Sequence, residues 1–224
     1  MQGARYNNPS IKVDGKVFIV TGANTGIGKE TVKDLAKRKG TVYMACRDLQ
    51  KCEEARKEII LYSKNKNVFC RELDLTSFSS IKNFVKRFKA EQNRLDCLIN
   101  NAGVMRVKNR EITQEGFEMQ IGTNHLGHFL LTHLLLDYLK ASAPARIINV
   151  SSIAHTRGEI STSNFNSEIS YDPKKAYEAS KLCNVLFTRE LSKRLEGTGV
   201  TANSLHPGIV DTDLMRHMVS LFID

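Results

Sequence analysis

The chain has 224 residues, of which 41% are hydrophobic and 25% charged, and this suits one α/β domain with a buried core. No apolar run approaches the roughly 18 residues that a membrane helix needs, and the polar start excludes a secretory signal. The net charge of +9 is spread along the chain without a nucleic-acid-binding motif, so a solvated basic surface is favoured over nucleic-acid binding and a weak attraction to anionic membranes stays open.

Strands and helices are predicted to alternate along most of the chain. Short apolar runs beside loops predict strands, and apolar residues at helical spacing predict helices. The predicted strands are 16–21, 41–46, 68–73, 95–100, 145–150 and 200–205. The predicted helices are 27–39, 48–63, 77–91, 113–139 and 171–195, and residues 157–170 are expected to form a loop.

This alternation with short connections predicts an α/β fold of the Rossmann type. We expect a single doubly wound parallel β-sheet with helices on both faces. Residues 1–15 are expected to form a flexible lead-in, and residues 16–224 are expected to form the domain. Ligands bind such a sheet at the carboxyl ends of its strands, where the strand order reverses.

Three glycines lie where the first predicted strand passes into the first predicted helix, in the segment TGANTGIG. Gly22 permits a tight turn and a close approach of the backbone, Gly26 follows, and Gly28 lets the helix lie close to the strand. The free N–H groups and the positive dipole end of that helix suit a pyrophosphate. The placement predicts a dinucleotide site, with an ordinary glycine turn as the alternative.

The end of the second strand bears on the choice between NAD and NADP. The uncharged Cys46 is followed by Arg47, and a cation at this point can pair with a 2′-phosphate. Asp48 is an alternative acid for a ribose hydroxyl, but we interpret it as the cap of the next helix. Lys51, one turn into that helix, can add a second positive charge. The sequence therefore favours NADP.

Residues after the third and fourth strands can complete this site. Asp74, which Leu75 follows, can accept a hydrogen bond from an adenine amino group, or it can cap the next helix in competition with Thr76 and Ser77. Small and amide residues close the fourth strand, where they can line a cofactor and tie neighbouring strands together: Asn101, Ala102 and Gly103.

A phenol and an ammonium lie four residues apart on one helix face, as Tyr177 and Lys181. A free tyrosine has a pKa near ~10, and a nearby cation lowers it toward the range of proton transfer. Ser151 and Ser152 end the fifth strand and supply a hydroxyl at the same edge of the sheet. Asn124 lies in an apolar neighbourhood, where an unpartnered amide costs about 1–3 kcal/mol, and a water held between the lysine and solvent would satisfy it.

Together these motifs resemble the short-chain dehydrogenase/reductase family. The resemblance spans nearly the whole chain and rests on TGANTGIG at 21–28, NNAG at 100–103, Asn124, Ser151-Ser152, YEASK at 177–181 and HPG at 206–208. Other segments are similar to the retinol dehydrogenase subgroup: ACRD at 45–48, RELDL at 71–75, GFEMQ at 116–120, NHLGHFLLT at 124–132 and LFTRELSKRLEG at 186–197.

The resemblance implies an NADP(H)-dependent oxidoreductase that interconverts a lipophilic aldehyde or ketone and its alcohol, with substrates like retinal and retinol favoured. It implies Tyr177 as general acid/base, Lys181 as the residue that tunes it and holds the ribose, and Ser152 as the holder of the substrate oxygen. Asn124 would support the proton relay, and Thr212 would contact the nicotinamide carboxamide. The implied cofactor-binding residues are Gly22, Asn24, Thr25, Gly26, Ile27, Gly28, Arg47, Lys51, Asp74, Leu75, Asn101, Ala102, Gly103, Tyr177, Lys181, Pro207, Gly208 and Thr212.

Three features depart from the family pattern. Ser152 precedes Tyr177 by 25 residues, a longer gap than in much of the family, although the subgroup shares such an insertion. The sequence shows neither the subgroup's N-terminal hydrophobic anchor nor the substrate segment and seventh strand that follow the sixth strand in the family. The alternative function is therefore that of a truncated, catalytically weak isoform that binds the cofactor and has a regulatory or incidental role.

The remaining residue types point to few other partners. Five cysteines without a CxxC pair predict reduced thiols and an intracellular, reducing compartment, either cytosolic or peripheral on an organelle membrane. His125, His128 and His133 lack further ligands, so no metal site is expected. The absence of a GxSxG motif disfavours a hydrolase. A lipophilic substrate is the expected partner, nucleic acid is not, and homo-oligomers stay open.

Overall fold

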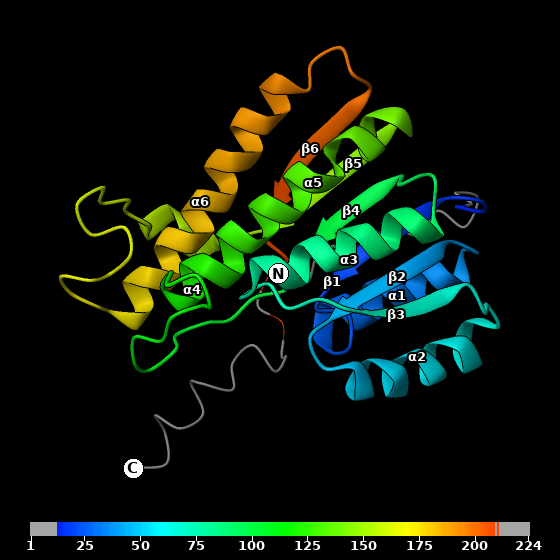
Figure 1. Ribbon diagram of the computed structural model, residues 1–224, viewed down its shortest axis with the longest axis horizontal. Helices are drawn as coiled ribbons and strands as arrows, with labels where there is room; N and C mark the ends of the chain where they lie inside the picture. The colour runs from blue at the N-terminus through cyan, green and yellow to red at the C-terminus, as the bar shows by residue number, and fades with distance from the viewer. Residues whose placement is uncertain (1–12, 209, 211–224) are drawn as a thin grey trace.

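The computed structural model describes residues 13–208 and residue 210. In this part of the chain, six parallel strands form one sheet in the order β3-β2-β1-β4-β5-β6 (Figure 1). The strands are β1 (Val17–Thr21), β2 (Thr41–Cys46), β3 (Val68–Glu72), β4 (Cys97–Asn100), β5 (Ala145–Val150) and β6 (Val200–Leu205). The order reverses between β1 and β4, which is where such sheets bind ligands.

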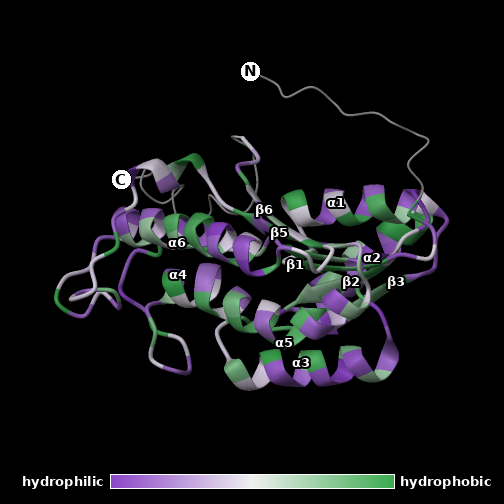
Figure 2. Ribbon diagram, turned by 90° about the horizontal axis from the view of Figure 1, so that it is seen from above, coloured by the Kyte–Doolittle hydropathy of each residue, from purple (hydrophilic) through white to green (hydrophobic). Residues whose placement is uncertain are grey.

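Helices cover both faces of the sheet. They are α1 (Gly26–Lys37), α2 (Leu49–Ser63), α3 (Phe78–Glu91), α4 (Met119–Ile121), α5 (Gly127–Ala141) and α6 (Pro173–Arg194), with a π-helical turn η1 (Gly122–Leu126) and a 3₁₀ helix η2 (Ile153–Arg157). One buried apolar cluster joins the sheet to α3, α5 and α6, and a second joins it to α1 and α2. Figure 2 shows α1 on one side and α3 with α5 on the other. The predicted doubly wound Rossmann-type sheet is confirmed.

Side-chain caps fix where several helices begin. The Asp48 carboxylate accepts a hydrogen bond from the backbone N–H of Lys51 at 3.0 Å, so its interpretation as the cap of α2 is confirmed. Ser77 caps α3 in the same way. Asp172 caps α6, which starts at Pro173, and a proline at the first helical position has no N–H to leave unpaired.

The prediction of one continuous helix over 113–139 is wrong in the first half of this range, where residues 113–118 are not helical and residues 122–126 form a π-helical turn. Residues 113–118 form a turn in which Gly116 has a φ of +83°, and an isolated bridge pairs Ile112 with Glu118. The helix starts only after Glu118, whose carboxylate accepts the backbone N–H groups of Gln120 and Ile121 and caps α4. It then widens into the π-helical turn η1 before α5. Helical periodicity alone did not reveal this turn or the widening.

The prediction of five reduced thiols is also wrong, because Cys52 of α2 and Cys70 of β3 form a disulfide. These residues lie 18 apart in the sequence, and the packing of α2 beside β3 brings them together. Cys46, Cys97 and Cys183 are free and buried. Burial raises the pKa of the Cys46 and Cys183 thiols to about 11 and that of Cys97 to about 12, so these groups stay protonated at neutral pH.

Within residues 13–208, no helix has both the length and the apolar character needed to cross a bilayer. Of the predicted lead-in, residues 1–12 lie outside the described part of the chain.

Candidate active site

A cavity of about 910 Å³ opens at the carboxyl edge of the sheet. The structure brings most of the predicted site residues into its wall: Gly22, Asn24, Thr25, Gly26, Ile27, Arg47, Lys51, Asp74, Leu75, Asn101, Ala102, Gly103, Ser152, Tyr177, Lys181, Pro207 and Gly208. Gly28 and Asn124 lie behind this wall, and Thr212 lies outside the described residues. Sequence reasoning missed Val104, Met119 and Thr123, which also line the cavity.

The glycine loop brings the start of α1 to the cavity. Gly22 has a φ of +62°, and a Cβ on Gly28 would collide with the Gly22 carbonyl oxygen and lie 2.6 Å from Asn101 Nδ2. The first turn of α1 contains no acidic residue, and among the described residues no side chain caps it at Thr25. Its free N–H groups therefore face a cavity that Gly26 and Ile27 line, which fits a cofactor pyrophosphate.

The end of β2 presents basic groups to the same cavity. Arg47 and Lys51 are exposed and line it. The Asp48 carboxylate is engaged as the cap of α2 and lies 3.8 Å from Lys51 Nζ. Cys46 at the strand end is buried and uncharged at neutral pH.

Asp74 lines the cavity and does not cap α3, because Ser77 has that role. The Asp74 Oδ1 atom accepts hydrogen bonds from the N–H of Thr76 at 2.9 Å and from its hydroxyl at 2.7 Å. Among the described residues these are the donors to this carboxylate, and Oδ2 is left for a ligand. The alternative of Asp74 as the cap of α3 is therefore wrong, and its binding of an adenine amino group stays a prediction.

A chain of hydrogen bonds ties β1 to β4 and α5. The backbone N–H groups of Asn101 and Ala102 each donate to Thr21 Oγ1 at 2.9 Å. With its oxygen so occupied, the Thr21 hydroxyl donates to His128 Nε2 at 2.9 Å, and the Nδ1–H of His128 donates to the Asn124 carbonyl at 3.1 Å. Burial lowers the pKa of His128 to about 3, so this histidine is a neutral structural link.

Tyr177 and Lys181 lie together beside the cavity. Lys181 Nζ is 5.6 Å from the centre of the Tyr177 ring and donates to the Val150 carbonyl at 3.1 Å. Burial raises the pKa of Tyr177, while a hydrogen bond with Ser152 and the charge of Arg106 lower it. The pKa of Tyr177 is raised overall and Lys181 is not among its causes, so the predicted lowering of this pKa by Lys181 is wrong. Arg106 is a cation near the phenol that sequence reasoning missed.

The two serines at the end of β5 have different surroundings. Ser151 is buried, and its hydroxyl donates to the Lys181 carbonyl at 2.9 Å. Ser152 is only partly buried and caps η2 by accepting the N–H of Ala154 at 3.2 Å. The hydroxyl of Ser152 therefore keeps a proton to donate toward Tyr177 or a substrate, which supports the choice of this serine over its neighbour.

Asn124 is fully buried on η1, and protein groups satisfy its amide in place of the water that we predicted. Its Oδ1 accepts the N–H of Val104 at 2.8 Å, and its Nδ2 donates to the Val104 carbonyl and to Ser180 Oγ, both at 2.9 Å. Asn124 thus joins the cavity wall after β4 to α6. Its part in a proton relay stays a prediction.

Lys181 is buried, and burial lowers its pKa from 10.5 to about 8. Because the pKa of Lys181 is lower in the folded state than in the unfolded state, folding disfavours the charged form of this side chain. The resulting penalty in unfolding free energy applies in full below about pH 8 and vanishes toward pH 10.5. At about 1.4 kcal/mol per pKa unit, the penalty at neutral pH is about 3 kcal/mol.

We therefore expect the unfolding free energy of Lys181→Met to exceed that of the parent chain at pH 7. We expect this difference between the two chains to be smaller at pH 9.5. Urea unfolding at both pH values measures the difference. Lys57→Met, an exposed lysine on α2, should show no pH-dependent difference. An advantage of the same size at both pH values would contradict the burial of a charged lysine.

The histidines of this region bind protein groups. His128 uses both ring nitrogens, as described, and His125 Nδ1 lies 3.1 Å from Asn184 Oδ1. In the part of the chain that the structure describes, no three His, Cys, Asp or Glu side chains are placed to hold a metal ion.

Comparisons with known proteins agree with this geometry. The model of the short chain dehydrogenase family matches residues 16–220. Retinol dehydrogenase 13 of Homo sapiens is 56% identical over 206 residues, which cover 92% of this chain and 62% of that protein. The chain therefore spans less than two thirds of the length of this relative.

Solved structures of similar fold were also found. An uncharacterised protein from Mycobacterium paratuberculosis has a TM-score of 0.79 and 43% identity, over 88% of this chain and 69% of that one. A complex of Pseudomonas aeruginosa RhlG with NADP in its active site has a TM-score of 0.77 and 26% identity, over 96% of this chain and 80% of that one.

Proposed function

The chain belongs to the short-chain dehydrogenase/reductase family, and from this premise we propose that it is an NADP(H)-dependent oxidoreductase. It interconverts a lipophilic aldehyde or ketone and its alcohol. One observation carries the proposal: Ser152, Tyr177 and Lys181 line the same cavity as the glycine loop at the start of α1. This shared cavity supports the proposal, in which Tyr177 is the proton donor and the glycine loop binds the dinucleotide.

The chain's own groups handle the substrate oxygen. A bound nicotinamide dinucleotide supplies the hydride. Hydride arrival at a carbonyl carbon leaves negative charge on the oxygen, which Tyr177 neutralises by donating its proton while Ser152 holds the oxygen in place. In the reverse direction Tyr177 accepts the proton of the alcohol. Lys181 holds the cofactor ribose and keeps positive charge near the phenol.

The preference for NADP rests on the end of β2. Arg47 and Lys51 line the cavity and can meet a 2′-phosphate, whereas the Asp48 carboxylate is engaged as a helix cap and as the ion-pair partner of Lys51. A guanidinium binds phosphate oxygens in a bidentate manner, so Arg47 is the main determinant.

The substrate class follows from the similarity to a protein named retinol dehydrogenase. Retinal and retinol are long, apolar molecules with a single reactive oxygen. The buried Tyr177 and the partly buried Ser152 can bind that oxygen, and the rest of such a molecule needs an apolar surface beside them.

The test is the oxidation of NADPH by the purified chain with a panel of aldehydes that includes retinal, decanal and propanal. We expect turnover with the long aldehydes. Tight NADPH binding without turnover on any aldehyde would contradict this function and favour a cofactor-binding chain with a regulatory role. Failure to bind any nicotinamide cofactor would contradict both.

A further inference from the structure

Arg106 lies in the connection between β4 and α4, and its backbone has a φ of +53°. This left-handed conformation is uncommon for a residue with a Cβ, and it persists only where the surrounding structure holds it. Here the fully buried Gln120 holds it, because its Oε1 accepts the N–H of Arg106 at 2.7 Å. A buried side chain therefore fixes the position of Arg106.

Two buried amides join residues 104–106 to α6 on both sides of Tyr177. The Nε2 of the same glutamine donates to the Pro173 carbonyl at 3.0 Å, one turn before the tyrosine. Asn124, which holds the cavity wall after β4, donates to Ser180 Oγ at 2.9 Å, and the Ser180 hydroxyl donates to the Tyr177 carbonyl at 2.7 Å. These contacts bring the connection and the turn of α6 that carries the tyrosine together.

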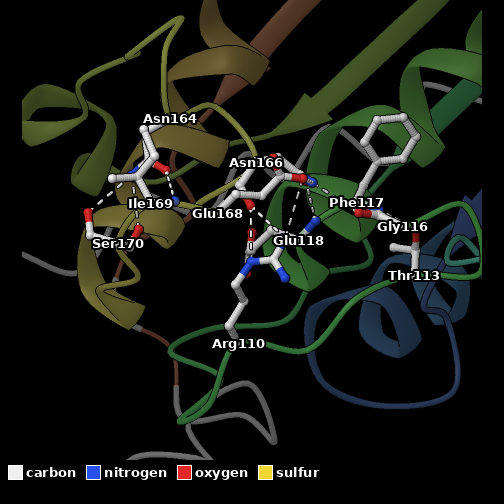
Figure 3. Close-up of polar contacts among 10 residues, drawn as sticks. All are labelled: Arg110, Thr113, Gly116, Phe117, Glu118, Asn164, Asn166, Glu168, Ile169 and Ser170. Carbon is white, nitrogen blue, oxygen red and sulfur yellow. Dashed lines mark hydrogen bonds and ion pairs between the residues drawn. The ribbon is translucent and has the colours of Figure 1, made fainter.

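The Arg106 guanidinium is partly buried and, among the described residues, has no hydrogen-bond or ion-pair partner. Arg110 of the same connection gives a contrast. Its guanidinium donates to the Asn166 carbonyl at 3.2 and 3.0 Å, and its Nη2 lies 3.9 Å from Glu168 Oε1 (Figure 3). The charge of Arg110 is thus engaged by a neighbouring loop, whereas no carboxylate of the described residues neutralises the charge of Arg106.

Other charged or titratable groups lie on α6 near Tyr177 and on the elements that pack against this helix. Lys181 Nζ donates to the Val150 carbonyl, and the Glu178 carboxylate is paired with Arg157 of η2. The remaining groups are Glu118 before α4, His125 of η1, His155 of η2, Tyr171, the exposed Asp172, Lys174 and Lys175 at the start of α6, and His206 after β6. Solvent screens the exposed charges of this set, and the ion pair neutralises that of η2.

Lys181 loses its positive charge in the alkaline range, where a phenol ionises, because burial lowers its pKa to about 8. A guanidinium keeps its proton throughout this range. Burial raises the pKa of Tyr177, and a hydrogen bond with Ser152 and the charge of Arg106 oppose this effect. A phenolate at Tyr177 therefore has Arg106 as its permanent positive neighbour.

We propose that Arg106 is a positioning residue for proton transfer, a permanent positive charge held beside Tyr177 that favours its phenolate form. This inference rests on the proposed oxidoreductase function. In alcohol oxidation the phenolate oxygen takes the proton of the alcohol O–H, while the C–H bond of the same carbon breaks and its hydride passes to NADP⁺. Arg106 does not line the cavity, so it acts through the ionisation of Tyr177.

The test uses two variants without the charge, Arg106→Gln and Arg106→Met, and one that keeps it, Arg106→Lys. All three keep a Cβ, so the left-handed backbone is the same in each. Lys108→Gln removes an exposed charge two residues further along and controls for general electrostatic effects. Because the Arg106 side chain has no bonded partner among the described residues, NADPH affinity should change by less than about twofold in every variant.

The direct measurement is a titration of Tyr177 by NMR in a chain labelled at the tyrosine Cζ carbons, with Tyr177→Phe to identify the signal. We expect a higher pKa of Tyr177 in both charge-free variants than in the parent chain, and a pKa close to that of the parent in Arg106→Lys and Lys108→Gln. The titration needs no turnover. An unchanged pKa in the charge-free variants, or an equal rise in Lys108→Gln, overturns the inference.

Turnover provides a second readout. For decanol oxidation with NADP⁺, kcat/KM at pH 7 should fall by about threefold or more in Arg106→Gln and recover in Arg106→Lys. The pH at which kcat/KM stops rising should be higher in Arg106→Gln, and beyond it the loss should disappear. A loss of the same size at every pH would show a purely structural role and overturn the inference. If the parent binds NADPH but oxidises no alcohol, the proposed function fails, and the NMR titration alone decides the inference.

Discussion

Replacing Tyr177 with phenylalanine is expected to abolish turnover while leaving NADPH affinity nearly intact. The ring is buried, so phenylalanine fills the same space and only the hydroxyl is lost. That hydroxyl is the group placed to protonate the carbonyl oxygen, and general acid catalysis typically contributes about 10²–10⁴-fold. Rates with NADPH and a long aldehyde, and calorimetric NADPH binding, measure the two quantities.

A matched control is Tyr43→Phe. Tyr43 is also buried, and its hydroxyl accepts a hydrogen bond from Gln92 at 3.1 Å on the face of the sheet that packs against α3. It should keep near-parent turnover. Near-parent turnover in Tyr177→Phe would show that another group moves the proton.

Changing Arg47 to aspartate is expected to reverse the cofactor preference from NADPH to NADH. The guanidinium can form charge-assisted hydrogen bonds with the 2′-phosphate, which contribute about 1.5–3 kcal/mol, or roughly 10–100-fold in affinity. An aspartate repels the phosphate and accepts hydrogen bonds from the ribose hydroxyls of NADH. Because Arg47 is exposed, the unfolding free energy should change little.

Lys57→Asp makes the same change of charge on α2, away from the cavity wall, and controls for general electrostatic effects. It should preserve the preference for NADPH. The assignment of Arg47 would be wrong if calorimetry gave equal affinities of the parent chain for NADPH and NADH.

Much of the fold could be predicted because its signals are local. Apolar runs marked the six strands, and the glycines of TGANTGIG marked the turn into α1. Asp48 predicted the start of α2, because a helix cap accepts a hydrogen bond from a backbone N–H only three residues further along the chain. The position of Tyr177 and Ser152 at one edge of the sheet could also be predicted, because ligands bind such sheets at the carboxyl ends of the strands.

What could not be predicted depends on contacts between distant residues. The pairing of Cys52 with Cys70 follows from how α2 packs beside β3. The turn before α4 forms because Asn166, 48 residues further on, accepts the N–H of Glu118. A polar loop without periodicity gives no sign of such a partner. The sequence also did not reveal that the charge of Arg106 lies near Tyr177, because these two residues are far apart in the chain.

The most direct test of the central claim follows the transferred hydrogen. The purified chain is incubated with retinal or decanal and with NADPH that carries deuterium at both C4 positions of the nicotinamide, and the alcohol is analysed by mass spectrometry. We expect a single deuterium on the former carbonyl carbon with the parent chain and no deuterated alcohol with Tyr177→Phe. Binding of NADPH without any deuterated alcohol from the parent chain, across the aldehyde panel, would contradict the proposed oxidoreductase function.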